Sequence, residues 1–264
     1  MIQVGIIGSG FIGPAHLEAL RRVGDIEVVA LCDGSLEMAQ QKARQLNVAH
    51  AYGSVEALLA HPGLQVVHNC TPNHLHARIN RQILSAGLHV FSEKPLCMTA
   101  EEARELVALA EDAGVVHGVS FVYRQFAMVQ QAAAMVRNGD VGRLFAAHGS
   151  YLQDWMLLET DYNWRVDSAQ GGASRAVADI GSHWCDTVQF MTGRRIVEVM
   201  ADLSIVWPTR KAPVAGDATF SQHRDDSAYE ARPVDTEDLG SVLFRFDDGS
   251  KGCFTVSQVS AGRK

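Results

Sequence analysis

A glycine-rich turn close to the N-terminus constrains the fold of this chain more than any other feature. The apolar run Ile2–Ile7 leads into the turn, and Gly8–Gly13 has the sequence Gly-Ser-Gly-Phe-Ile-Gly. Apolar residues at helical spacing follow over Ile12–Val23. A GxGxxG pattern that lies between a strand and a helix is typical of a dinucleotide-binding site.

The glycines of the turn have separate steric roles. Gly8 permits the tight turn, and Gly10 lets the backbone approach a pyrophosphate. Gly13 lets the helix pack closely against the strand. The N–H groups and the dipole at the helix start favour a phosphate, so we expect Phe11 and Ile12 to take part in cofactor binding as well.

Asp33 follows the second expected strand, about twenty residues after the last glycine of the turn. A carboxylate at this position can accept hydrogen bonds from both ribose hydroxyls and would repel the 2′-phosphate of NADP. NAD is therefore the expected cofactor, with NADP left open. The alternative is a glycine turn and a helix-capping Asp in a similar fold that holds no dinucleotide.

Strands and helices alternate through the first half of the chain. Repeated units of this kind predict an α/β fold with a doubly wound parallel sheet, whose ligands bind at the carboxyl ends of the strands. The expected strands are Ile2–Ile7, Glu27–Cys32, Gln65–Cys70, His89–Ser92 and Val115–Ser120, and the expected helices are Ile12–Val23, Leu36–Leu46, Val55–Ala60, His74–Ala86 and Ala100–Ala113.

Polar motifs follow two of these strands. Thr71, Pro72 and Asn73 come after Gln65–Cys70, and His76 lies in the first turn of the next helix. These four residues are candidate cofactor contacts. A plain turn with Asn73 as a helix cap is the alternative.

Glu93 and Lys94 follow the strand His89–Ser92, before a proline. A lysine beside a bound nicotinamide favours the alkoxide-like state of a substrate hydroxyl and can hold ribose and substrate together. The alternative is an exposed lysine with Glu93 as its surface partner.

The pattern changes after residue 121, which predicts a dinucleotide-binding domain over residues 1–121 and a substrate-binding domain over 122–264. Long strands joined by hairpins favour an α+β domain with an open, mostly antiparallel sheet. Pro208–Asp238 is polar and irregular, and long enough to be a lid, an oligomer arm or a mobile loop. The expected elements are the helices Ala127–Val136 and Thr187–Met191, the latter continuing an earlier helix, and the strands Leu144–Leu152, Ile196–Trp207, Leu239–Phe246 and Cys253–Ser260.

Asp179 and His183 are four residues apart, so on a helix they share one face, and Asp186 follows. The spacing leaves three interpretations open. Asp179 can cap a helix, the Asp–His pair can relay a proton, or the three residues can bind a metal. No further ligand is evident nearby, so we expect no metal.

Composition excludes several classes of protein. The net charge of −7 argues against a nucleic-acid binder or a protein that binds anionic membranes. The five cysteines form no CxxC pair, and free thiols suit the cytoplasm. We expect a cytoplasmic protein without a membrane span.

The ordered set of motifs resembles the glucose–fructose oxidoreductase, inositol dehydrogenase and rhizopine-catabolism family (Gfo/Idh/MocA). The set comprises the glycine turn, Thr71-Pro72-Asn73 with His76, Glu93-Lys94-Pro95, and Asp179-x-Gly-x-His183. The resemblance implies a two-domain NAD- or NADP-dependent enzyme. Such an enzyme transfers hydride between the nicotinamide and a hydroxyl or keto carbon of a sugar, cyclitol or sugar derivative.

The resemblance also implies the roles of the catalytic residues, which are Lys94, Asp179 and His183. His183 would be the general base, since the ordinary pKa of histidine suits that role. Asp179 would orient it or relay its proton, and Lys94 would polarise the hydroxyl and contact both cofactor and substrate. Asp179 and His183 would also contact the substrate. A non-catalytic NAD- or sugar-binding regulatory protein with the same fold is the alternative.

Other residues fall where members of this family line the cleft. They are expected to contact cofactor or substrate. The cofactor candidates are Arg124, Trp164 and Arg165, and the substrate candidates are Tyr123, Asp154 and Trp164.

Members of the family usually continue well past the last residue of this chain. We therefore expect a C-terminal domain that is a fragment or has a shortened sheet with an exposed edge. The resemblance implies a homodimer or homotetramer formed through the C-terminal sheet.

Overall fold

The structure is a computed structural model that describes residues 1–214 and 229–262. The chain divides into an N-terminal unit, Met1–Ser120, and a C-terminal unit, Phe121–Lys264. Among the described residues, no helix is both long and apolar enough to cross a bilayer.

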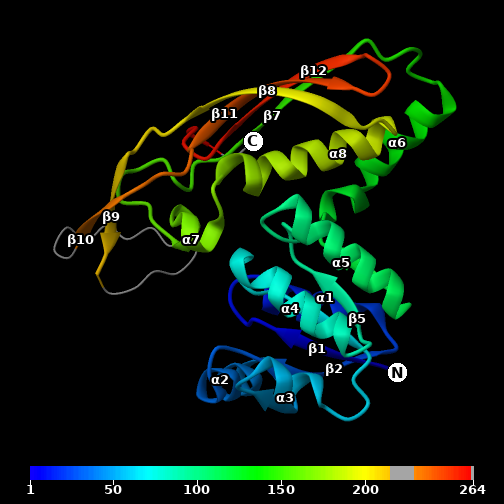
Figure 1. Ribbon diagram of the computed structural model, residues 1–264, viewed down its shortest axis with the longest axis vertical. Coiled ribbons are helices and arrows are strands. Elements are labelled where there is room, and N and C mark those ends of the chain that lie inside the picture. Colours follow the sequence, from blue (N-terminus) through cyan, green and yellow to red (C-terminus); the bar gives the residue numbers. More distant parts are fainter. Residues whose placement is uncertain (215–228, 263–264) are drawn as a thin grey trace. The chain divides into compact units, whose positions relative to one another are not determined.

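The N-terminal unit is built on a six-stranded parallel sheet of order β3-β2-β1-β4-β5-β6 (Figure 1). This order is that of a doubly wound dinucleotide-binding fold, so the predicted fold class is confirmed. The elements of the unit are β1 (Ile2–Ile7), α1 (Gly13–Val23), β2 (Ile26–Cys32), α2 (Leu36–Leu46), β3 (His50–Tyr52), α3 (Val55–Leu59), β4 (Val66–Asn69), α4 (Asn73–Ser85), β5 (His89–Ser92), α5 (Ala100–Ala113) and β6 (His117–Val119).

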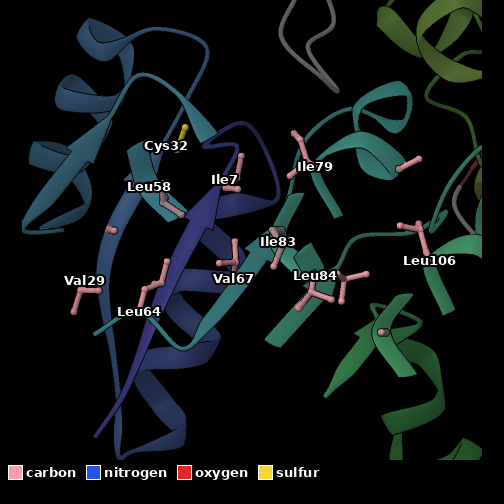
Figure 2. Packing of buried hydrophobic residues seen from close by; sticks show 14 residues of the cluster. Ile7, Val29, Cys32, Leu58, Leu64, Val67, Ile79, Ile83, Leu84 and Leu106 are labelled. Atoms are coloured by element: carbon pink, nitrogen blue, oxygen red, sulfur yellow. The ribbon is translucent and has the colours of Figure 1, made fainter. Parts of the chain in front are cut away.

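Apolar side chains cover both faces of this sheet. On one face, Ile7 and Val67 of neighbouring strands pack against Leu58 of α3 and Ile83 of α4 (Figure 2). Leu17 and other side chains of α1 and α2 pack on the opposite face. Burial on both faces explains why β1 is a continuous apolar run rather than an alternating one.

The loops that follow the strands of the N-terminal unit lie at one edge of the sheet, at the carboxyl ends of the strands. The backbone N–H of Gly8, after β1, donates to the carbonyl of Cys32 in β2 at 2.9 Å. The N–H of Glu93, after β5, donates to the carbonyl of Asn69 in β4 at 2.8 Å. The loops after β1, β2, β4 and β5 therefore start at neighbouring points of one edge, as the sequence predicted.

The C-terminal unit contains a four-stranded sheet of order β7-β12-β11-β8, in which only the β7–β12 pair is parallel. Helix α8 lies along one face of it (Figure 1). The open, mostly antiparallel sheet is thus confirmed. The elements are η1 (Val122–Gln125), α6 (Ala127–Asn138), β7 (Ala146–Leu152), η2 (Trp164–Val166), α7 (Ser168–Gly171), η3 (Val177–Gly181), α8 (Ser182–Thr192), β8 (Ile196–Ser204), β9 (Thr209–Pro213), β10 (Tyr229–Pro233), β11 (Leu239–Phe246) and β12 (Lys251–Ser257).

Two expectations about secondary structure were wrong. Strand β3, His50–Tyr52, was not predicted, because three residues carry too little pattern. The segment Pro208–Asp238 was expected to be irregular, yet β9 and β10 lie in it and pair antiparallel. Strand β9 was not predicted because its buried position 210 is an arginine, so the strand lacks the alternation of apolar and polar residues. Residues 215–228 lie outside the described part of the chain.

A buried cluster of charges lies beside this strand pair. The carboxylate of Asp238 is fully buried between the guanidinium groups of Arg175 and Arg210, with Arg210 at 2.6 Å. Its Oδ2 also accepts hydrogen bonds from the backbone N–H groups of Val206 and Trp207, at 2.7 and 3.1 Å. Burial by itself would raise the pKa of Asp238, but Arg175 and these donors hold that pKa below its ordinary value.

Replacing Asp238 by alanine is expected to lower the free energy of unfolding by about 3–5 kcal/mol, because two buried guanidinium groups would lose their carboxylate. All four tryptophans lie in the C-terminal unit, so urea unfolding followed by tryptophan fluorescence reports on it. Glu198→Ala is the matched control, since its pair with Arg245 is exposed. That control should cost below about 1 kcal/mol. Equal losses in the two variants would contradict the assignment.

Candidate active site

The glycine turn forms a cradle that side chains would fill. Gly8 has a φ of +93°, and a Cβ there would lie 2.6 Å from the carbonyl oxygen of Cys70. A Cβ on Gly13 would overlap the carbonyl oxygen of Gly8, whereas a Cβ on Gly10 would meet nothing within 4 Å. Gly8 and Gly13 are therefore required by the protein itself. Gly10 borders open space, which fits the close approach of a pyrophosphate.

The carboxylate of Asp33 is fixed beside this turn. Its Oδ2 accepts hydrogen bonds from Ser9, from the backbone N–H at 3.0 Å and from the hydroxyl. Its Oδ1 accepts from the N–H of Gly34 at 2.7 Å. The start of α1 carries no acidic residue in its first turn, so nothing there opposes a phosphate. The turn and Asp33 together fit a dinucleotide with a free ribose diol.

The loops after β4 and β5 are joined through His76. This buried ring contacts two backbone carbonyls, that of Pro95 through Nδ1 at 2.6 Å and that of Thr71 through Nε2 at 2.7 Å. Helix α4 starts at Asn73 with Pro72 as its N-cap residue, so the alternative in which Asn73 is the helix cap was wrong. His76 therefore connects the backbone of Thr71 with that of Pro95, which follows Lys94.

Glu93 lies against two buried histidines that the sequence analysis missed. His16 of α1 contacts the Glu93 carboxylate through Nε2 at 3.0 Å and the Nδ1 of His68 through its own Nδ1 at 2.9 Å. Glu93 Oε2 also accepts from the backbone N–H of Lys94 at 3.1 Å. Burial, with a smaller contribution from His16, lowers the pKa of His68 to about 4. Neither histidine belongs to a motif that the sequence shows.

Asp179 lies in an irregular helical turn rather than at a cap. The segment η3 is a π-helix, and the N–H of Ser182 donates to the carbonyl of Val177 to close it. His183 lies in the first turn of α8, which follows directly. The alternative in which Asp179 caps a helix was therefore wrong. Single π-turns of this kind occur often at functional sites, since they re-aim side chains.

Aromatic and hydroxyl groups surround the Asp179–His183 pair. The rings of Tyr123 and His183 lie 4.5 Å apart, and the hydroxyl of Tyr123 bonds that of Tyr151 at 2.5 Å. The amide of Gln153 donates to the Tyr151 hydroxyl at 3.3 Å. Burial, then Tyr123 and the charge of Asp179, raise the pKa of Tyr151. Tyr151 stays a neutral donor beside the pair. Tyr123 was predicted from the sequence and Tyr151 was not, although Tyr151 lies near the end of a predicted strand.

Asp186 pairs with Arg124, whereas the metal-binding alternative required Asp186 to bind a metal ion together with Asp179 and His183. Both of its carboxylate oxygens bond the guanidinium of Arg124, with Nε to Oδ2 at 2.8 Å. A carboxylate held in this way is a poor third ligand beside Asp179 and His183. In residues 1–214 and 229–262, no three His, Cys, Asp or Glu side chains are grouped so as to hold a metal.

The remaining candidates are spread along the loops of the C-terminal unit. The guanidinium of Arg165 lies over the ring of Trp164, 4.4 Å from its centroid. The carbonyl of Asp154 accepts from the N–H of Leu157 at 3.0 Å and starts the turn after β7. These contacts order the loops, while the binding roles of the three residues stay predictions.

Family models match both parts of the chain. Residues 2–121 match the oxidoreductase family with an NAD-binding Rossmann fold, and residues 129–264 match the GFO/IDH/MocA C-terminal domain. The N-terminal part is thus an NAD-binding Rossmann domain of an oxidoreductase. The chain belongs to the Gfo/Idh/MocA family.

Several relatives of this chain have names that state an activity. Levoglucosan dehydrogenase of Pseudarthrobacter phenanthrenivorans is 30% identical, over 99% of this chain and 69% of the relative. The 1,5-anhydro-D-fructose reductase of Ensifer adhaerens is 32% identical, over 76% of this chain and 60% of the relative. A solved levoglucosan dehydrogenase in complex with NADH and L-sorbose is 29% identical, with a TM-score of 0.89, and the match covers 100% of this chain and 69% of that one. The chain therefore spans about two thirds of the length of these relatives.

Alanine at Gly10 and alanine at Gly13 are expected to have different effects. Gly10→Ala should leave the melting temperature unchanged, since its Cβ meets no protein atom, but weaken NADH binding about tenfold or more, roughly 1.4 kcal/mol. Gly13→Ala should lower both stability and binding. Fluorescence titration with NADH and thermal unfolding measure the two quantities. Unaltered NADH affinity in Gly10→Ala would show that the pyrophosphate does not approach there.

The buried His68 is expected to make stability depend on pH. Its pKa of about 4 in the folded chain lies below the ordinary 6.5, so the unfolded chain takes up the proton first. The contribution of neutral His68 to the free energy of unfolding is complete above pH 6.5 and is lost as the pH falls towards 4. The whole contribution is on the order of 3 kcal/mol.

Urea unfolding followed by far-UV circular dichroism at neutral pH and at about pH 5 measures this loss. His68→Asn keeps an N–H for His16 but does not titrate, so it should lose less stability on acidification. His117→Asn, which removes an exposed histidine of β6, is the control. The same loss in His68→Asn as in the unaltered chain would exclude His68 as its source.

Proposed function

We propose that this chain carries an NAD-dependent dehydrogenase activity towards a hydroxyl group of a sugar or sugar derivative. The observation that supports it most is the arrangement around Asp179 in the C-terminal unit. An aspartate and a histidine there lie with two bonded tyrosine hydroxyls, a set suited to accept a proton from a hydroxyl group. Family membership supplies the oxidoreductase class.

The cofactor site is proposed to follow the loops at the edge of the parallel sheet. Gly8, Gly10 and Gly13 approach the pyrophosphate, and Asp33 accepts hydrogen bonds from the ribose hydroxyls. A fixed carboxylate at this position repels a 2′-phosphate, which supports NAD over NADP. The further cofactor contacts that we propose are Phe11, Ile12, Thr71, Pro72, Asn73, His76, Glu93, Lys94, Arg124, Trp164 and Arg165.

The chemical roles follow from the side chains. NAD, when bound, supplies the acceptor for the hydride that leaves the substrate carbon. His183 accepts the hydroxyl proton at a ring nitrogen, and the carboxylate of Asp179 stabilises the charge that the proton brings. Lys94 donates a hydrogen bond to the substrate oxygen and favours its alkoxide-like state. Tyr123, Asp154 and Trp164 are proposed to bind the other hydroxyl groups of the sugar.

We further propose that the protein acts as a homo-oligomer in the cytoplasm. Apolar side chains on the C-terminal sheet support the first part, because Val197, Val199, Met200 and Leu243 are each at least half exposed on β8 and β11. The cytoplasmic location is supported by the five cysteines, which are all free thiols. Sedimentation analysis of the purified protein measures its oligomeric state.

Turnover with NAD and a panel of sugars tests the proposed activity. The panel includes levoglucosan, 1,5-anhydrosugars, glucose, galactose and myo-inositol, and the appearance of NADH is followed by its absorbance. Lys94→Ala should lower kcat by about a hundredfold or more while NADH still binds. Lys251→Ala, at an exposed lysine of β12, is the matched control.

The outcomes separate the two functions considered for this fold. NADH formation with one sugar, lost in Lys94→Ala and kept in the control, supports the dehydrogenase. Tight NADH binding without turnover of any sugar by the unaltered chain would favour a binding or regulatory protein instead.

A further inference from the structure

The buried side chain of Gln258, just after β12, links the Asp179 carboxylate to the charge cluster around Asp238. Its Nε2 donates a hydrogen bond to Oδ2 of Asp179 at 3.0 Å. Its Oε1 accepts one from Nη1 of Arg175 at 3.2 Å. Gln258 is fully buried, whereas its partner Asp179 is partly exposed.

The chemistry of Arg175 fixes which way the Gln258 amide points. A guanidinium can only donate hydrogen bonds, so the amide oxygen must face Arg175 and the amide N–H groups must face Asp179. The backbone of Gln258 is also held on both sides, because its N–H donates to the carbonyl of Asp238 and its carbonyl accepts from Met156 at 3.0 Å. The amide therefore has one orientation.

Arg175 is itself held by buried partners. Its guanidinium pairs with Asp238 and donates to the hydroxyl of Thr236 at 3.3 Å. Its backbone N–H donates to the carboxylate of Glu237 at 3.0 Å. A continuous series of hydrogen bonds thus runs from Arg210 through Asp238, Arg175 and Gln258, which are all buried, to the partly exposed Asp179.

We propose that Gln258 is a positioning residue for the proton-accepting pair, a role that rests on the proposed function above. Its N–H fixes the rotation of the Asp179 carboxylate and favours the charged form that stabilises a protonated His183. Tyr151 of β7 is the other titratable group shown to feel the charge of Asp179. Arg175, Asp238, Arg210 and Glu237 are the charged groups behind Gln258.

Gln258→Glu tests the proposal because it keeps an acceptor for Arg175 but places a carboxyl group against Asp179. Two adjacent carboxyl groups share a proton, so the pair should bind one at higher pH than Asp179 does in the unaltered protein. At high pH kcat should fall about tenfold or more. The deficit should shrink as the pH falls, because a protonated carboxyl group again donates to Asp179. KM for NAD should not change.

Two further variants complete the experiment. Gln258→Leu removes the N–H without adding charge, so its loss of kcat should not depend on pH. Gln189→Glu is the matched control, since the hydrogen bond that the Gln189 side chain makes within the described residues uses Oε1, which accepts from the N–H of Ile196 at 2.9 Å. It should retain the kcat and pH profile of the unaltered protein. Tryptophan fluorescence confirms that each variant is folded.

The titration of the Asp179 carboxyl group by carbon NMR is the readout that does not need activity, with Asp179→Asn for assignment. A raised pKa of Asp179 in both Gln258→Glu and Gln258→Leu, with no change in Gln189→Glu, supports the positioning role even if no sugar is turned over. A titration and a pH profile equal to those of the unaltered protein would overturn it. Failure of the sugar panel alone would count against the proposed function and not against this inference.

Discussion

The buried pairing of Asp238 with Arg175 and Arg210 is the interaction on which the C-terminal unit depends. A carboxylate without solvent contact is tolerable only when its hydrogen-bonding capacity is filled, and here two guanidinium groups and two backbone N–H groups fill it. Arg210 adds hydrogen bonds to the carbonyls of Leu158 and Asp161, at 2.8 and 2.9 Å. Strand β9, the loop after β7 and the start of β11 are thereby held to one centre.

The N-terminal unit depends on steric exclusion instead. The turn after β1 requires glycine at two positions, because a Cβ at Gly8 or Gly13 would overlap backbone atoms. Helix α1 can begin at Gly13 because this residue lies directly against the Gly8 carbonyl. The polar residues of the neighbouring loops are then held by hydrogen bonds to one another, as in the contacts of Asp33 with Ser9. In the N-terminal unit close packing thus fixes the backbone of the turn and hydrogen bonds fix the polar side chains, whereas the C-terminal unit uses a buried charge cluster.

The sequence predicted the parallel sheet well because its signals are local. Helix Leu36–Leu46, for example, has a Ser35 cap and ends where its apolar spacing ends, and the observed bounds are the predicted ones. Contacts between distant residues left no local signal. Gln258 meets Asp179 and Arg124 meets Asp186 only after the chain has folded, and β9 was missed because a buried Arg210 is visible only through its partners. The π-turn at Asp179 was missed for another reason, because a single i→i+5 hydrogen bond leaves no pattern in the sequence.

His76 has a mechanical consequence for the cofactor site. Because the ring bridges the carbonyls of Thr71 and Pro95, the loop after β4 cannot shift without pulling on the loop after β5. Burial lowers the pKa of His76, so the neutral ring carries one N–H and donates it to one of the two carbonyls while it packs against the other. The ring is thus a physical connection between the two loops, through which a displacement that a ligand imposes at Thr71 can reach the backbone next to Lys94.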